Sequence, residues 1–217
     1  MRAATHAFGM PNEIADGVHD ITCLVREGGG RIRAYLVEDD VPTLFDCGLP
    51  DSTDALVDGI EAIGLPPERL VITHGDGDHV GGFDAVVEHY GVETYVPEGT
   101  ELDAEHAPDH RYADGDRIGS FEAVHLPGHE PDNHALVDEE AGVAVLGDAL
   151  SGADQRGLPA GYFHLPPAVY STDLNEAEAS LERLQGYDFD VGLVYHGSSV
   201  LGGARAVLDE YVYRLPG

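Results

Sequence analysis

Four side chains that can bind a metal ion lie within six residues of one another in the first half of the chain. They are His74, Asp76, Asp78 and His79, with single glycines between the first three. These small residues allow a tight turn in which side chains two and four positions apart converge. Imidazole and carboxylate groups bind zinc, manganese and iron. The stretch therefore predicts a metal site, and the alternative interpretation is a polar loop whose aspartates cap a helix.

Three later residues could complete the site that this stretch cannot form alone. His129 lies in a Pro-Gly-His turn after an apolar run, whereas Asp148 and His196 each follow the end of an expected strand. Functional sites of α/β architectures collect at strand ends, so all three are candidate ligands. His125 and His134 flank the His129 turn, and we interpret them as residues packed on strands or supporting the ligands.

The elements that must position these side chains alternate between strand and helix patterns, which predicts helices packed outside mixed sheets. Expected strands cover 18–26, 31–38, 43–48, 70–72, 92–96, 117–118, 121–126, 134–137, 143–146 and 189–195. Expected helices cover 53–63, capped by Ser52 or Thr53 and stopped by Gly64, and also 83–90, 175–184 and 204–213. Residues 1–16 are expected to be extended or poorly ordered, 98–116 irregular, and 151–168 a long loop.

Two features concern the larger organisation of the chain. The glycines within 27–30 indicate a hairpin between the first two strands. Residues 81–90 resemble 202–211, and each segment follows a strand that ends in His-Gly. Two similar halves packed face to face would bring their strand ends to one edge, although so short a repeat could also arise by chance. We expect one domain over 1–217.

Composition sets limits on compartment and partners. The 217 residues include 41 acidic and 11 basic side chains, the basic ones all being arginine, for a net charge of −30. Such repulsion becomes tolerable where salt shortens the Debye length to about 3 Å at 1 M. The composition favours the cytoplasm of a salt-accumulating organism over an acidic mesophile protein. It argues against nucleic acid and anionic membranes as partners.

Cysteine usage and hydropathy agree with a cytoplasmic location. Cys23 and Cys47 lie in separate apolar runs, where free buried thiols are expected in preference to a disulfide. We find no stretch with the pattern of a signal peptide or a membrane span. The expected partner is a small-molecule substrate, and a homo-oligomer is compatible with the sequence.

The ordered motifs resemble the metallo-β-lactamase superfamily of metallo-hydrolases over about residues 18–217. The matching segments are His74-x-Asp76-x-Asp78-His79, Pro127-Gly128-His129, Gly147-Asp148, His196-Gly197 and the early strand-end Asp46. The resemblance implies an αββα sandwich of two mixed sheets flanked by helices, with a two-metal site in the cleft between its halves.

The resemblance also implies a distribution of ligands. One metal would be held by His74, Asp76 and His129 and the other by Asp78, His79 and His196, with Asp148 bridging them. The departure is Asp76, where the family usually has His. A carboxylate there adds negative charge, which weakens the first metal as a Lewis acid and favours harder cations. Two divalent ions are expected, zinc first, with iron or manganese as alternatives because a flavodiiron branch also has a carboxylate there.

The implied reaction is hydrolysis by a metal-activated water. Asp78 would steady that water or protonate the leaving group. The favoured substrates are small and ester-like, either a thioester of the glyoxalase II type or a lactone. Residues 161–166 would either overhang the site, where His164 could contact substrate, or simply pack on the domain. Two alternatives remain: an iron-dependent redox protein of the flavodiiron or persulfide dioxygenase type, and a non-catalytic binding module stabilised by metal.

Overall fold

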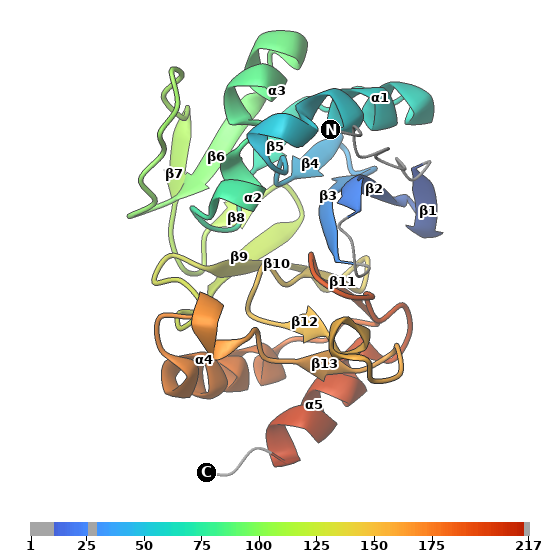
Figure 1. The fold of residues 1–217 in the computed structure, drawn as a ribbon, viewed down its shortest axis with the longest axis vertical. Coiled ribbons are helices and arrows are strands. Elements are labelled where there is room, and N and C mark those ends of the chain that lie inside the picture. The colour runs from blue at the N-terminus through green and yellow to red at the C-terminus, as the bar shows by residue number, and fades with distance from the viewer. Residues whose placement is uncertain (1–10, 26–29, 215–217) are drawn as a thin grey trace, which may run out of the picture.

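Four layers make up the part of the chain that the computed structural model describes, which is residues 11–25 and 30–214. Two β-sheets face each other, α1 and α3 cover the outer face of one sheet, and α4 and α5 cover the other (Figure 1). This is the αββα sandwich of two mixed sheets that the sequence predicts. Within the described residues, no helix has the length and apolar character needed to cross a membrane.

The first sheet has seven strands in sequence order, antiparallel from β1 to β4 and parallel from β4 to β7. Their bounds are β1 (Asn12–Ala15), β2 (Val18–Val25), β3 (Arg31–Val37), β4 (Thr43–Phe45), β5 (Arg69–Val71), β6 (Glu93–Pro97) and β7 (His110–Tyr112). Because β4 and β5 are parallel neighbours, the segments that follow them leave the sheet at the same edge. Asp46 and the loop that contains His74 lie at that edge.

The second sheet has five strands in the order β14-β11-β10-β9-β8. Their bounds are β8 (Arg117–Ile118), β9 (Phe121–His125), β10 (His134–Asp138), β11 (Val143–Val145) and β14 (Val191–Leu193). The pair β11 and β14 is parallel, so the chain leaves both strands at one edge, toward Asp148 and His196. A separate two-stranded ribbon consists of β12 (Ser151–Gly152) and β13 (Phe163–His164).

The helices cover the outer faces with short apolar stripes. Their bounds are α1 (Thr53–Ile63), α2 (Gly77–Val80), α3 (Phe83–Tyr90), α4 (Leu174–Ser180) and α5 (Ala204–Arg214). On α1 the buried stripe includes Leu56 and Ile60, and Gly64 ends the helix in the left-handed conformation, as predicted. Four short 3-10 helices cover Pro50–Ser52, Ala153–Arg156, Ala168–Tyr170 and Leu181–Gly186.

Three apolar clusters fill the spaces between the layers. One lies between the two sheets and includes Tyr35 and Phe45 from the first sheet and Leu193 from the second. Another packs the first sheet against α1 and α3, and the third packs the second sheet against α4 and α5. Each sheet is therefore buried on both faces, which explains why strands such as β3 are apolar at successive positions.

Several local predictions need correction. Strand β7 lies in 98–116, expected to be irregular, whereas β1 agrees with the extended alternative for 1–16. The long loop 151–168 contains β12, β13 and a 3-10 helix. Short polar strands of this kind lack an apolar repeat, so only pairing with a neighbour reveals them.

Element boundaries and one helix cap also differ from expectation. The helix expected over 175–184 is α-helical only to Ser180, and the strand expected over 189–195 covers Val191–Leu193. Ser52 does not cap α1, because its hydroxyl donates to the Leu49 carbonyl instead. The strands β2 and β3 pair antiparallel as predicted. Their turn at 26–29 and the start at 1–10 lie outside the described residues.

Candidate metal centre

Asp46 is the point to which the metal-binding loop is anchored. Its carboxylate is completely buried and accepts hydrogen bonds from the Thr73 backbone N–H at 2.7 Å and the Thr73 hydroxyl at 2.8 Å. It also bonds His79 Nδ1 at 2.8 Å. Asp46 has a φ of 58°, a left-handed conformation that Asp tolerates better than most residues. The strand-end turn therefore directs this carboxylate beneath the loop.

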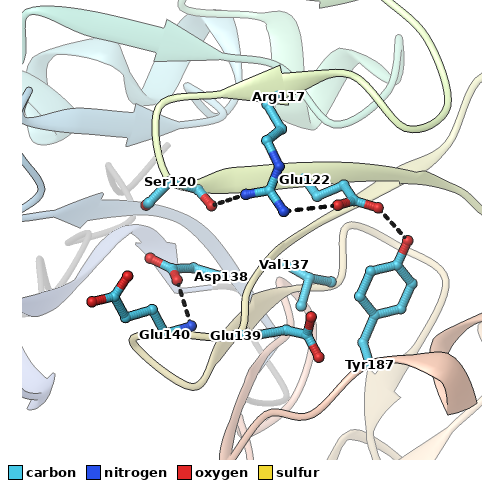
Figure 2. A pocket seen from close by; sticks show the side chains of 8 residues that line it. All are labelled: Arg117, Ser120, Glu122, Val137, Asp138, Glu139, Glu140 and Tyr187. Atoms are coloured by element: carbon cyan, nitrogen blue, oxygen red, sulfur yellow. Dashed lines mark hydrogen bonds and ion pairs between the residues drawn. The ribbon is translucent and has the colours of Figure 1, made fainter.

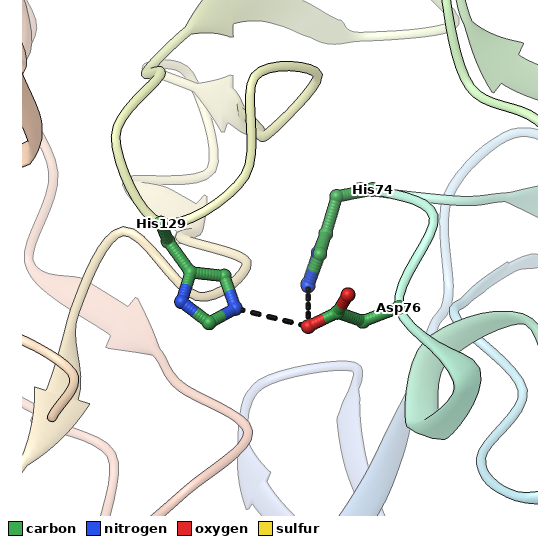
Figure 3. Close-up of side chains that lie close together, drawn as sticks. All are labelled: His74, Asp76 and His129. Carbon is green, nitrogen blue, oxygen red and sulfur yellow. Dashed lines mark hydrogen bonds and ion pairs between the residues drawn. The ribbon is translucent and has the colours of Figure 1, made fainter. Parts of the chain in front are cut away.

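His74, Asp76 and His129 form the group that we call the first triad (Figure 3). Both histidines direct Nε2 at one oxygen of Asp76, with His129 Nε2 at 3.2 Å and His74 Nε2 at 3.7 Å from Oδ2. The two imidazoles are almost fully buried, whereas the Asp76 side chain is 39% exposed. The first triad therefore joins two rigid buried donors to one carboxylate on the open side.

Asp78, His79 and His196 form the second triad. Asp78 and His79 lie on the short helix α2, and His196 comes from the segment after β14 in the other half of the sandwich. His196 Nε2 lies 3.5 Å from Asp78 Oδ2, and the ligand atoms of all three residues lie within 4.8 Å of one another.

Asp148 lies between the two triads. Its Oδ2 is 3.1 Å from His196 Nε2 and 3.6 Å from His129 Nε2, and its Oδ1 is 3.6 Å from His79 Nε2. The side chain is buried, and its backbone N–H donates to the side-chain oxygen of Asn133 at 3.1 Å. Asp148 can therefore contribute an oxygen to either triad, as the bridging assignment requires.

Hydrogen bonds at Nδ1 fix the orientation of three of these rings. His74 Nδ1 is 3.0 Å from the Thr73 hydroxyl, and His129 Nδ1 is 3.4 Å from the Ser171 hydroxyl. The contact of His79 Nδ1 with Asp46 is the shortest and involves a carboxylate. Metal-binding histidines commonly have such a partner on the second nitrogen, which leaves the first free for the ion.

Among the predicted ligands, all of which the structure describes, two buried atoms have no hydrogen-bond partner: Nε2 of His74 and Oδ1 of Asp148. Leaving such atoms unpaired in the interior is costly, and a cation between them would satisfy both. Nitrogen and carboxylate donors in this proportion suit zinc, iron or manganese. The residues present therefore fit two divalent ions, although the assignment of individual ligands stays a prediction.

The charges of the centre also favour a bound cation. Burial raises the pKa of Asp148, but the neighbouring His196 and His79 outweigh it and hold that pKa well below its usual range. The hydrogen bond from His129 and the nearby imidazole of His74 lower the pKa of Asp76. Burial opposes protonation of His79, yet Asp46 and Asp148 raise its pKa to about 10. The carboxylates thus stay ionised and attract positive charge, either protons or metal ions.

An open cavity of about 450 Å³ lies above both triads. Beyond residues of the triads and Asp148, its lining comprises Leu49, Gly77, Ser151, Gln155, Pro166, Pro167 and Tyr170. This volume suits a small molecule. Of the segment 161–166, which the sequence predicts to overhang the site, only Pro166 lines this cavity, and Pro167 and Tyr170 follow it.

His164 is not among the residues that line this cavity; it packs against Tyr211 of α5, with ring centroids 6.0 Å apart. Sequence reasoning missed Gln155 and Tyr170, since a Gly/Pro-rich loop gives no periodic signal for the direction of its side chains. His125 and His134 are paired across β9 and β10, with ring centroids 4.9 Å apart. That arrangement agrees with their interpretation as strand residues.

A second cavity, of about 270 Å³, lies at the opposite ends of β9 and β10 (Figure 2). Arg117 crosses it and pairs with Glu122 at 3.0 Å, and the Tyr187 hydroxyl donates to the same carboxylate group at 2.7 Å. The Asp138 carboxylate already accepts the Glu140 backbone N–H. In this second cavity the side chains of Arg117, Glu122, Tyr187 and Asp138 all have hydrogen-bond partners, in contrast to the unpaired atoms of the metal centre.

The comparison with known proteins agrees with the candidate metal site, because the matching proteins include metallo-hydrolases. A model of the metallo-beta-lactamase superfamily matches residues 28–116. Hydroxyacylglutathione hydrolase GloC of Haemophilus influenzae is 30% identical over 168 residues, which cover 67% of this chain and 76% of GloC. The probable metallo-hydrolase YflN of Bacillus subtilis is 24% identical, with 94% of this chain and 92% of YflN covered. The match to YobT of the same bacterium covers only 62% of that protein.

A solved structure extends this relationship to the fold. TTHA1623, crystallised in a di-iron-bound form, matches 86% of this chain and 96% of its own length, with 25% identity and a TM-score of 0.66. Relatedness of this extent in sequence and fold places the chain in a known family: it belongs to the metallo-beta-lactamase superfamily.

Proposed function

We propose that this protein is a metal-dependent hydrolase that cleaves a small, uncharged ester-like substrate, either a thioester or a lactone. The observation that carries the proposal is the pair of unsatisfied buried atoms, His74 Nε2 and Asp148 Oδ1, at the meeting point of two ligand triads beneath an open cavity. The hydrolase activities named for GloC and YflN support the reaction class.

The first triad would hold one divalent ion, the second triad the other, and Asp148 would contact both. When bound, such ions polarise a carbonyl oxygen and lower the pKa of a water molecule. The protein's own contribution is orientation, because the ligand rings are buried and fixed at Nδ1. Asp78 lines the cavity, so a carboxylate oxygen there can take a proton from water and return it to the leaving oxygen or sulfur.

The lining of the cavity favours an uncharged substrate. None of the twelve described residues that line it is lysine or arginine, and the lining includes Leu49, Pro166 and Tyr170. An anionic thioester such as a glutathione conjugate would find no lysine or arginine side chain there to pair with its carboxylates. Gln155 and Ser151 offer neutral hydrogen-bonding groups instead.

The proposal is tested by metal counting and turnover in molar KCl. Protein loaded separately with Zn²⁺, Mn²⁺ and Fe²⁺ is assayed on a neutral acyl thioester of N-acetylcysteamine, a γ-lactone and a hydroxyacylglutathione. We expect chelator-sensitive hydrolysis of a neutral substrate, with kcat/KM at least about tenfold above that for the glutathione thioester.

Matched histidine variants provide the control for this assay. His129→Gln should abolish turnover, whereas His110→Gln, on the exposed β7, should not change it. Two bound metals without turnover on any ester would contradict the hydrolase proposal and favour the non-catalytic module. A preference for the glutathione conjugate would contradict the uncharged-substrate part alone.

A second candidate is an iron-dependent redox activity, favoured by the carboxylate at position 76 and by the di-iron form of TTHA1623. Here the test is metal content after anaerobic purification in the presence of both zinc and iron. Preferential iron loading with oxygen consumption, and no ester hydrolysis, would select this candidate. Zinc loading with ester hydrolysis, the result we expect, would eliminate it.

We also propose that the protein works in the salt-rich cytoplasm of a halophile. The net charge of −30 and the absence of lysine support this proposal. Since salt screens the repulsion between surface carboxylates, the melting temperature should rise steadily between about 0.1 and 2 M KCl. A flat or falling profile would contradict it.

A further inference from the structure

Arg33 is a buried cation in the middle of the sandwich, at a position where the surrounding strand is apolar. It lies on β3 with only 2% of its surface exposed. Arg33 and Tyr35 are two positions apart, so both project from the same face of β3. That face is the inner one, because Tyr35 belongs to the cluster between the two sheets. The guanidinium is therefore directed at the opposite sheet.

The groups that Arg33 meets there are the backbone carbonyls on both sides of His196. Its Nη1 donates to the carbonyl oxygens of Val194 at 3.4 Å and Tyr195 at 3.2 Å, and also to that of Gly197. One nitrogen of the first sheet thus contacts three carbonyls of the segment that follows β14. These residues lie beyond the end of the strand, where ladder hydrogen bonds are no longer available.

Other groups from both halves hold the same segment. The Tyr35 hydroxyl donates to the Val194 carbonyl at 2.5 Å and contacts the Ser199 hydroxyl at 2.9 Å. The Ser199 hydroxyl in turn accepts the Val194 backbone N–H at 3.1 Å. On the other side, the His196 carbonyl accepts the Gly152 N–H at 2.7 Å. The backbone on either side of His196 is therefore fixed, although the structure gives its ring no Nδ1 partner of the kind that holds His79.

Asp20 fixes the guanidinium itself. Its Oδ2 accepts the Arg33 Nε–H at 3.0 Å, and its Oδ1 accepts the Thr22 hydroxyl at 3.0 Å. Asp20 and Thr22 lie on β2, which pairs with β3. A planar guanidinium can donate to a carboxylate at one edge and to carbonyls at the other, which a lysine ammonium cannot do with the same geometry.

We propose that Arg33 is a positioning residue for the second triad. It holds the segment 194–197 against the first sheet so that His196 Nε2 stays within reach of Asp78 and Asp148. Among the described residues, its hydrogen bonds and its ion pair do not involve the first triad, whose residues come from other loops. Loss of the guanidinium should therefore weaken metal binding at the second triad selectively. This inference rests on the proposed metal centre and needs no knowledge of the substrate.

The test is metal titration of Arg33→Lys and Tyr35→Phe, compared with the unmodified protein in molar KCl. Co²⁺ binding is followed by visible absorption and confirmed by metal analysis after gel filtration. For Arg33→Lys we expect the tighter of the two binding steps, which we assign to the second triad, to lose about 10- to 100-fold in affinity, the range for residues that orient ligands. The other step should change by less than about twofold. Tyr35→Phe should show the same selectivity with a smaller loss.

Arg69→Lys is the matched control. Arg69 is also a buried strand arginine, but it donates to the Thr43 hydroxyl and stacks on Tyr95 at the end of β5 remote from the triads. The Arg69→Lys variant should bind metal in both steps with unchanged affinity. A melting curve of each metal-free variant shows whether it is folded, and Tyr35→Phe still tests the proposal if Arg33→Lys does not fold.

Each result decides between the two proposals. If the unmodified protein binds fewer than two metals, the proposed centre fails. If it binds two, and both Arg33→Lys and Tyr35→Phe bind two with unchanged affinities, only the positioning role fails. Equal weakening of both steps, or the same loss in Arg69→Lys, would also overturn that role, because it would indicate a general effect on stability.

Discussion

The two triads differ in how their ligands are held. The first triad combines two nearly fully buried histidines with Asp76, which is 39% exposed. Its histidine rings are oriented by neutral hydroxyls, with His74 Nδ1 3.0 Å from that of Thr73 and His129 Nδ1 3.4 Å from that of Ser171. The second triad is supported by charged groups, since Asp46 bonds His79 Nδ1 at 2.8 Å and Arg33 binds the backbone around His196. Charge-assisted hydrogen bonds are stronger, so we expect the second triad to hold its ion more firmly than the first.

This difference indicates a division of roles. A rigid triad keeps its ion, whereas a triad with an exposed, short carboxylate exchanges its ion more readily and adapts to the metal that is available. Asp76 is also the position at which the chain departs from the usual pattern of its superfamily. The following substitutions test whether the two triads differ in how firmly they hold their metal ions.

Asp148→Asn should have the largest effect, because Asp148 is the group within reach of both triads. The amide keeps the shape but replaces an anionic ligand with a neutral one. We expect both metals to bind more weakly and kcat to fall by at least about 100-fold, beyond the range for residues that only orient ligands. Metal analysis and turnover measure this directly.

Asp138→Asn is the control for that change, since Asp138 is a buried aspartate that binds backbone N–H groups of a remote turn. Loss of only one metal in Asp148→Asn would show that the triads are independent and that Asp148 does not bridge them.

The charged support of His79 provides the next test. Asp46→Asn keeps the left-handed backbone, which Asn also tolerates, but replaces a carboxylate oxygen with an amide that cannot serve every donor of Thr73 and His79. Binding at the second triad should weaken by about 10- to 100-fold. Ser171→Ala, which removes the weaker support of His129, should cost the first triad less than about tenfold. The reverse ranking would contradict the comparison.

The sequence predicts most of this architecture because its strongest signals are local. Apolar periodicity and a glycine stop predict α1 and its end at Ile63, and the motif spacing predicts that residues of both halves converge. Short edge elements such as β7 and β12 carry no such pattern. Their pairing depends on neighbours far away in the chain, which periodicity does not encode.

The same limit explains which residues of the centre were missed. His and Asp at strand ends are recognisable because few other roles require them there. Arg33 lies within an apolar strand, and only the packing of the two sheets reveals that its guanidinium reaches the carbonyls around His196, 161 to 164 positions later. Tyr170 and Gln155 line the cavity through loop geometry that no spacing predicts.

The charged surroundings of His79 also predict a pH dependence of the metal-free protein. Although burial opposes it, Asp46 and Asp148 raise the pKa of His79 from 6.5 to about 10. The folded state therefore binds a proton that the unfolded state loses above its own pKa, so stability falls as pH rises. Between pH 6.5 and about 8.5 the free energy of unfolding should fall by roughly 2 kcal/mol.

Chemical denaturation of chelator-treated protein measures this slope. His79→Gln should flatten it, and so should saturating metal, because the ion replaces the proton on the ring. If the free energy of unfolding of His79→Gln fell with pH as steeply as that of the unmodified protein, the pH dependence would come from other groups.

Among the predicted ligands themselves, Asp76 is the residue whose replacement should have the smallest effect. Because it is a single exposed ligand of the first triad, Asp76→Ala should weaken that ion by about tenfold and leave the second triad almost unchanged. Asp76→His restores the usual residue of the superfamily, and its longer imidazole should shift preference toward zinc over manganese or iron. Competitive loading with equimolar metals, followed by metal analysis, measures both effects. If Asp76→Ala kept its metal content and affinity, Asp76 would not be a ligand. The exposed carboxylate would then face substrate, and the difference between the triads would concern substrate recognition instead of metal exchange.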